Sequence, residues 1–170
     1  MIAGIDSMVL VYAGIVPSNP ATRADDFQEL QVRAKILLHK LARESETTIL
    51  PTIAISEILV PVPRGQKGAL VAALTKMFVC APFDLRASTI AADLWSEHKK
   101  LPQDLQYAKR HVLRADTMIV ASAHAAGATV FYSHDKKCRA LAGLLMKAHA
   151  LPKNDPDDMF IEGDIRRGDV

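Results

Sequence analysis

The chain has 170 residues, of which 49% are hydrophobic and 24% are charged, and its formal net charge is +2. These values are typical of a globular domain with a sizeable core, and they exclude a largely disordered chain. The small net charge does not by itself indicate nucleic-acid binding, so such a function would depend on where the charges lie.

The N-terminal residues are apolar, but they lack the basic segment of a secretory signal, and Asp6 interrupts them. No stretch approaches the roughly 18 apolar residues of a membrane span. We therefore expect a soluble, cytoplasmic protein. Cys80 and Cys138 fit no metal-ligand spacing, and we expect two free thiols, with a disulfide between them as the alternative.

The first half of the chain predicts alternating strands and helices. Residues 2–6 form a short buried strand, which residues 7–12 either extend or follow as a helix. Residues 14–22 are rich in Gly, Pro, Ser and Asn and predict a loop. The next predicted elements are a helix over 25–44, a strand over 47–51, a helix over 52–60, a helix over 68–77, a strand over 78–83 and a helix over 86–100.

The second half continues the alternation. After Pro102, apolar residues recur in steps of three and four, which predicts one long helix ended by Gly127. The predicted apolar stripe comprises Leu105, Ala108, Val112, Ala115, Ile119, Ala123 and Ala126. A strand is expected over 128–133, a helix over 138–148, a turn-rich tail over 151–160 and an exposed end over 162–170. Strands alternating with helices indicate an α/β fold with a parallel sheet covered on both faces.

Four acidic residues stand where this pattern expects apolar ones. Asp6 ends the first strand, Glu57 lies in the helix after the second, Asp116 edges the apolar stripe of the long helix, and Asp135 follows the strand over 128–133. Because the carboxyl ends of parallel strands gather at one edge, we expect these acids to lie close together.

Clustered carboxylates repel one another, and a divalent cation removes the conflict. Mg²⁺ and Mn²⁺ prefer oxygen ligands, so the pattern indicates a shared metal site. Taken singly, Asp6 and Asp135 could instead be helix caps or turn residues. Glu57 and Asp116 could be paired buried acids or surface acids.

The segments GIDSMVLVYA, PTIAISEIL, RADTMIVASAHAAG and VFYSHD resemble, in this order, the four conserved blocks of PIN-domain nucleases. VapC-type toxins of bacterial toxin–antitoxin pairs are the largest group of these. The resemblance runs from residue 1 to about residue 145. It implies a three-layer α/β/α sandwich with a central, mainly parallel sheet, formed by a PIN-like nuclease domain over 1–150, with the tail over 151–170 packed on or extending it.

The resemblance also implies an activity, namely hydrolysis of RNA phosphodiester bonds with Mg²⁺ or Mn²⁺. Asp6, Glu57, Asp116 and Asp135 fall on the family's metal-binding and catalytic positions, and Ser7 and Ser133 on supporting ones. A toxin of this kind would bind a small antitoxin protein, and we also expect a homodimer.

The sequence departs from the family pattern in places. Met8 stands where the family often has Asn, and Asp135 is followed by Lys136 instead of leading to a further acid. We therefore expect one metal to be held weakly or only with substrate. The chain is also longer than a typical toxin of this family, with the excess expected over 14–24 and from 150 onward.

Seven cations flank the acidic blocks and are candidates for binding RNA, whose phosphates supply most of the affinity in such complexes. The alternative is that they are solvated surface charges. They are Arg64, Lys67, Lys109, Arg110, Arg114, Lys136 and Lys137.

Two other functions stay open. The first is an acid-edged α/β phosphatase, although haloacid-dehalogenase-like enzymes need a second Asp where Met8 stands, and receiver domains need an acidic pair at the first strand. The second is a PIN-like interaction module without activity. The sequence contains no H-E-x-x-H, G-x-x-x-x-G-K-[ST] or G-x-S-x-G motif.

Overall fold

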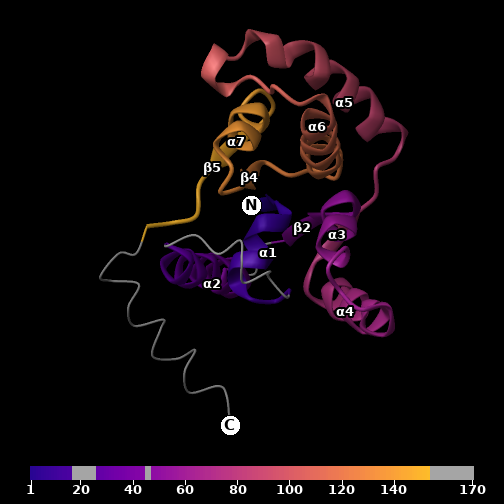
Figure 1. Ribbon diagram of the computed structural model, residues 1–170, viewed down its shortest axis with the longest axis vertical. Coiled ribbons are helices and arrows are strands. Elements are labelled where there is room, and N and C mark those ends of the chain that lie inside the picture. The colour runs from indigo at the N-terminus through magenta and orange to yellow at the C-terminus, as the bar shows by residue number, and fades with distance from the viewer. Residues whose placement is uncertain (17–25, 45–46, 154–170) are drawn as a thin grey trace.

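A computed structural model of the chain describes residues 1–16, 26–44 and 47–153 (Figure 1). The strands of this part form one sheet in the order β3-β2-β1-β4-β5, and every neighbouring pair is parallel. The predicted α/β class with a mainly parallel sheet is therefore confirmed. The strands are β1 (Ile2–Ile5), β2 (Thr47–Pro51), β3 (Val79–Ala81), β4 (Val130–Tyr132) and β5 (Lys147–His149).

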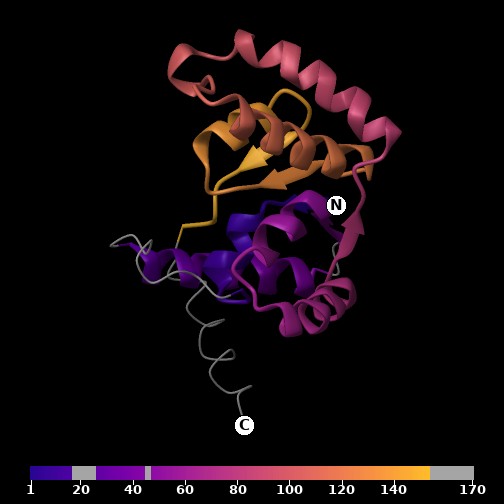
Figure 2. The ribbon, with the colours of Figure 1, turned by 45° about the vertical axis from the view of Figure 1, so that its right-hand side comes forward.

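Helices cover both faces of the sheet, as the sequence predicts. Helices α5, α6 and α7 lie on one side of the strands, and α1, α2 and α4 lie on the other (Figure 2). None of the described helices is long and apolar enough to cross a membrane. The helices are α1 (Ser7–Ala13), α2 (Phe27–Arg43), α3 (Thr52–Leu59), α4 (Arg64–Met77), α5 (Leu85–Glu97), α6 (Arg110–Ala125) and α7 (Lys136–Ala142), with 3₁₀ turns at His98–Lys100 and Gln103–Leu105.

Strand β1 lies in the middle of the sheet and is packed on both faces. Ala3 and Ile5 are fully buried, and the glycine between them allows close packing. A Cβ atom on Gly4 would lie only 2.8 Å from the ring of Phe131 on β4 and 2.9 Å from Cβ of Ala123 on α6. Such distances are too short for real Cβ contacts, so glycine at this position lets β4 and α6 approach the central strand.

Most of the predicted elements are present, with shifted ends. The segment over 7–12, left open between strand and helix, is the helix α1. Helix α4 begins at Arg64, four positions before the predicted start, because Pro63 precedes it with a backbone suited to entering a helix. Strands β3 and β4 are shorter than the predicted 78–83 and 128–133.

The prediction of one long helix from residue 103 is wrong at its start, since α6 begins at Arg110. Gln106, which the prediction placed in the helix, instead has extended backbone, and its side-chain amide donates to the carbonyls of Lys99 (3.1 Å) and Leu101 (2.9 Å). The ammonium group of Lys137 donates to the Gln106 carbonyl at 2.8 Å. These contacts, of which the one with Lys137 is long-range, replace the local helical hydrogen bonds.

The predicted apolar stripe of α6 is also displaced. Val112 is 39% exposed, whereas Leu113 and Thr117 are buried, so the inward face is turned by about one residue at the start of the helix. Further along, Ile119 and Ala123 are buried as predicted. The helix is followed by Gly127 with a φ of 96°, which confirms the predicted glycine at its end.

The helix predicted over 138–148 is wrong at both ends. Helix α7 starts earlier, at Lys136, and ends at Ala142, after which the chain forms β5. Residues 144–148 are mostly apolar, and no turn signal in the sequence separates them from the helix apart from Gly143. They leave the helical path because β5 pairs with the open edge of β4, with Val130 opposite Lys147.

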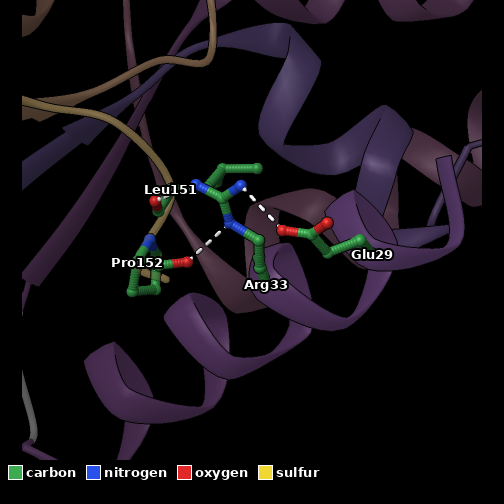
Figure 3. Close-up of polar contacts among 4 residues, drawn as sticks. All are labelled: Glu29, Arg33, Leu151 and Pro152. Atoms are coloured by element: carbon green, nitrogen blue, oxygen red, sulfur yellow. Dashed lines mark hydrogen bonds and ion pairs between the residues drawn. The ribbon is translucent and has the colours of Figure 1, made fainter. Parts of the chain in front are cut away.

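The chain after β5 crosses to α2, where Arg33 holds it (Figure 3). The guanidinium group donates to the carbonyls of Leu151 and Pro152, both at 2.7 Å, and lies 3.3 Å from a carboxylate oxygen of Glu29. Leu151 itself is buried. The start of the predicted tail thus packs on the α/β body, whereas residues 154–170 lie outside the described residues, as do residues 17–22 of the predicted loop.

Candidate functional site

Asp6 follows the last residue of β1 and remains largely buried, with 6% of its surface exposed. Its N–H donates to the carbonyl of Tyr132 at 3.1 Å, which extends the pairing of β1 with β4 by one residue. In the sheet, β2 and β3 lie on one side of β1, and β4 and β5 lie on its other side. Asp6, at the end of β1, therefore lies at the point where the strand order reverses. Ligand sites of open α/β sheets form at such points.

Two serine hydroxyls connect Asp6 to two of the other acids. The hydroxyl of Ser133 donates to Oδ2 of Asp6 at 2.7 Å and accepts the N–H of Asp135 at 3.1 Å. The hydroxyl of Ser7 lies 2.8 Å from Oε2 of Glu57 and 3.2 Å from Oδ1 of Asp6. Since a hydroxyl has a single proton, the shorter bond to Glu57 is the dominant one. The structure thus brings Asp6, Glu57 and Asp135 to one edge of the sheet.

Asp6 occupies the N-cap position of α1, where its carbonyl accepts the N–H of Val9 at 3.1 Å, but its side chain accepts no capping bond. Asp135 does cap a helix: its Oδ1 accepts the N–H groups of Lys137 at 2.6 Å and Cys138 at 2.9 Å. The cap uses one oxygen of an exposed side chain. The charge of Asp135 still reaches the cluster, where it raises the pKa of Asp6.

Asp116 joins the cluster from α6. Burial is the main cause that raises its pKa to about 7, and the charges of Asp6, Asp135 and Glu57 add to the increase. The hydroxyl of Tyr107 donates to Oδ2 of Asp116 at 2.7 Å and opposes this effect. All four predicted acids therefore interact, and at Asp116 their mutual repulsion adds to the effect of burial.

The pKa values of Asp6 and Glu57 are raised as well. Burial is the largest cause that raises the pKa of each carboxyl, and hydrogen bonds from Ser133 and Ser7 partly offset it at Asp6. At Glu57 the bond from Ser7 lowers the pKa, while the charge of Asp6 raises it. A positive charge among these groups would relieve both burial and repulsion.

The donor set suits a hard divalent cation, because all of its ligands would be oxygens. One oxygen each of Glu57, Asp116 and Asp135 accepts no hydrogen bond from any described residue. Within residues 1–16, 26–44 and 47–153, however, no three acidic, histidine or cysteine side chains are already grouped to hold a metal. The residues fit such an ion in chemistry, since Asp6, Glu57, Asp116 and Asp135 supply carboxylate oxygens.

Sequence reasoning missed two residues that position the site, Tyr107 and Arg139. Tyr107 lies in the segment expected to be helical, and no motif marks it as a partner of Asp116. Arg139 donates to the carbonyls of Ser133 (2.9 Å) and His134 (2.5 Å), and so holds the loop after β4. An arginine four positions after a helix-capping acid was the available signal, but it is common at helix surfaces.

The predicted cations fall into three groups. Lys136 is exposed and pairs with Asp104 at 3.4 Å, and Lys137 binds the Gln106 carbonyl and lies 5.9 Å from the ring centroid of Tyr107. These two therefore have structural partners. The second group, Arg64 and Lys67, lies in α4. The third group, Lys109, Arg110 and Arg114, lies at the start of α6.

No protein-family model and no curated protein matches the sequence. Two VapBC complexes are among the solved structures that resemble the chain. One is VapBC2 from Rickettsia felis bound to a DNA fragment from its promoter, with a TM-score of 0.58, 15% identity, and coverage of 89% of this chain and 100% of that chain. The other is DNA-bound VapBC from Salmonella typhimurium, with a TM-score of 0.56, 11% identity, and coverage of 89% and 99%. With the parallel sheet and its helices, this likeness shows that the chain has the PIN-domain fold of VapC proteins.

Proposed function

We propose that the chain is a divalent-metal-dependent endoribonuclease that acts at the edge of the sheet beside Asp6. One observation carries the proposal: Ser7 and Ser133 connect Asp6 to Glu57 and to the loop of Asp135, at the carboxyl ends of β1 and β4. Such an arrangement concentrates negative charge where a VapC-like fold has its reversal of strand order.

Each group has a distinct task in this proposal. Asp6, Asp116 and Asp135 would hold Mg²⁺ or Mn²⁺, and Glu57 would bind the ion or orient a water molecule. A bound ion lowers the pKa of water and stabilises negative charge on a phosphate. Ser133 fixes the Asp6 carboxylate, Ser7 fixes that of Glu57, and Tyr107 fixes that of Asp116. Fixed orientations of this kind favour the transition state because little reorganisation is needed.

The same proposal includes a biological role as the toxin of a toxin–antitoxin pair. It is supported by the likeness to two VapBC complexes. The expected partners are RNA as substrate, a small antitoxin protein and a second copy of the chain. Co-expression with the product of a neighbouring short gene tests the antitoxin: a partner should co-purify and suppress cleavage. Sedimentation of the isolated chain tests the homodimer.

The deciding experiment is cleavage of total RNA by the purified full chain with Mg²⁺ or Mn²⁺. Wild-type protein should cleave, a chelator should stop the reaction, and Asp6→Asn should lower the rate by roughly 100-fold or more. Asp93→Asn, which changes an acid on α5 outside the cluster, is the matched control and should keep full activity. Full activity of Asp6→Asn would contradict the proposal.

Two further measurements separate the other candidates. Binding of Mn²⁺ without cleavage of any RNA or DNA would favour a PIN-like interaction module. Hydrolysis of a phosphate monoester, with no effect on RNA, would favour the phosphatase.

A further inference from the structure

A pocket of about 380 Å³ lies between α5 and α6, and none of the four acids is among its lining residues. Its α6 wall comes from positions 110, 114, 117 and 118, which share one face of the helix. The opposite wall comes from α5 and from Phe83, which precedes this helix. The lining residues are Phe83, Ala91, Ala92, Trp95, Arg110, Arg114, Thr117 and Met118.

The pocket combines an aromatic wall with two cationic groups. The guanidinium carbon of Arg110 lies 5.7 Å from the ring centroid of Trp95, in cation–π geometry. Arg110 and Arg114 are exposed, and neither forms an ion pair with any described residue. Their charge is therefore available to an anionic ligand, and the apolar wall is available to a flat ring.

This chemistry matches a nucleobase with its adjoining phosphate. Aromatic side chains and guanidinium planes bind splayed-out bases by stacking, and nearby arginines bind the phosphate. An acidic peptide would use the two arginines but would leave the aromatic wall unexplained. The shared presence of both features favours the nucleotide.

The pocket is also within reach of the acids. Arg110 and Asp116 are six residues apart on α6, or about 9 Å along the helix axis. They face different sides of the helix, because the pocket positions and the position of Asp116 differ by more than a quarter turn. A single strand that bends around the start of α6 can therefore occupy the pocket and reach the acids within a few nucleotides.

We infer that the pocket between α5 and α6 binds one nucleobase and its adjoining phosphate from single-stranded RNA, with the base stacking on the Trp95–Arg110 pair and Arg114 binding phosphate. This inference rests on the proposed function for the identity of the strand as substrate. It adds a substrate subsite outside the acidic cluster.

Trp95 is the only tryptophan in the chain, so its fluorescence reports directly on the pocket. The full wild-type chain is titrated, in the presence of a chelator, with a short single-stranded RNA, with the same oligomer lacking bases, and with a mononucleotide. The complete RNA should quench the tryptophan. The oligomer without bases should bind roughly 5- to 150-fold more weakly and without quenching, which is the range expected for stacking of one base.

Variants then assign the contacts, with binding followed by anisotropy of labelled RNA. Arg114→Ala should weaken binding and reduce the slope of log affinity against log salt by about 0.7, the value for one phosphate contact on a single strand. Trp95→Phe should keep part of the stacking, and Arg110→Ala should weaken binding without disturbing the core. Arg43→Ala, on the opposite side of the sheet at the end of α2, is the control and should bind as the wild type does.

Several outcomes would overturn the inference. Equal binding and quenching by the oligomer without bases would mean that the pocket recognises phosphate alone. Quenching by the mononucleotide as strong as that by RNA would make it a site for free nucleotides. If both arginine variants kept the RNA affinity and salt dependence of the wild type, the pocket would not be an RNA-binding site. This conclusion would hold even if the wild type cleaves RNA. Conversely, consider a wild type that shows base-dependent quenching but no cleavage of RNA. That result would refute the proposed nuclease function and leave the pocket as a base-binding site.

Discussion

The hydroxyl of Ser133 donates a 2.7 Å hydrogen bond to the carboxylate of Asp6, which lies 127 positions earlier in the chain. The same hydroxyl accepts the N–H of Asp135. Both Ser133 and Asp6 are buried, so water cannot replace these contacts easily. One small side chain therefore connects the end of β1 to the loop that carries the last acid of the cluster.

Replacing Ser133 with Ala should destabilise the protein by about 1–3 kcal/mol, because it leaves a buried carboxylate oxygen and a backbone N–H without their partner. Urea unfolding measures the change in the free energy of unfolding. Ser96→Ala is the control, since its hydroxyl donates only to a carbonyl of its own exposed helix turn. Its effect should stay within about 0.5 kcal/mol. Equal stability of both variants would show that the Asp6–Ser133 bond has no structural weight.

Tyr107→Phe should raise the pKa of Asp116 above its value of about 7, because the lost hydrogen bond favours the charged carboxylate. Carboxyl-carbon NMR titration measures this change in the metal-free protein. Tyr12→Phe removes a hydroxyl that has no bond to Asp116 and should leave the titration unchanged. A lower pKa of Asp116 in Tyr107→Phe would contradict the assigned contact.

The metal-free protein should become less stable as the pH rises from about 4 to about 7. The pKa of Asp116 is about 7 in the folded chain and near its ordinary value of 3.8 when unfolded, so the folded state binds more protons in this window. The stabilisation is complete below pH 4 and is lost as the pH passes 7, with a size on the order of 2–4 kcal/mol.

Asp116→Asn provides the comparison, because it cannot release a proton. The difference in free energy of unfolding between this variant and the wild type should grow with pH across the same window, as measured by urea unfolding. Parallel pH profiles of the two proteins would contradict the raised pKa of Asp116.

Adding Mn²⁺ should raise the midpoint of thermal unfolding of the wild type. Binding to the folded state alone contributes about 2.7 kcal/mol at a free ion concentration 100 times the dissociation constant. Asp6→Asn and Asp135→Asn should reduce the effect, and Asp93→Asn should preserve it. A shift that is equal in all four proteins would indicate that the ion binds elsewhere.

Arg33→Ala should release the chain after β5, because it removes two hydrogen bonds of 2.7 Å to the carbonyls of Leu151 and Pro152 (Figure 3). We expect a loss of about 1–3 kcal/mol in the free energy of unfolding, since both bonds involve a charged donor. Amide hydrogen exchange over residues 147–153 should become faster. Arg43→Ala, at the exposed end of the same helix, should leave exchange in this segment unchanged.

The sequence predicts best the features that depend on local pattern. Apolar runs reveal β1, β2 and β4, and an acid at the end of such a run, as at Asp6, marks the edge of the sheet. The grouping of Asp6, Glu57 and Asp135 follows because parallel strands point their carboxyl ends to the same side. Asp116 follows from its place beside the buried face of α6.

Features that depend on distant partners are not predictable in this way. Residues 147–149 have no strand signature of their own, and they form β5 only because β4 offers an open edge. The segment over 103–109 has helical spacing, but Lys137 and the side chain of Gln106 hold it in another path. The contact of Tyr107 with Asp116 depends on that path and is hidden for the same reason.

The sheet order also has a consequence for synthesis on the ribosome. Strand β1 is made first and lies in the centre of the sheet, yet its second neighbour, β4, is complete only at Tyr132. Until then a growing chain has one open edge on β1, and Asp6 lacks Ser133. Since domains fold as units once their parts have emerged, the acidic cluster is assembled near the end of translation of the described chain. During most of translation, the nascent chain therefore lacks the assembled acidic cluster.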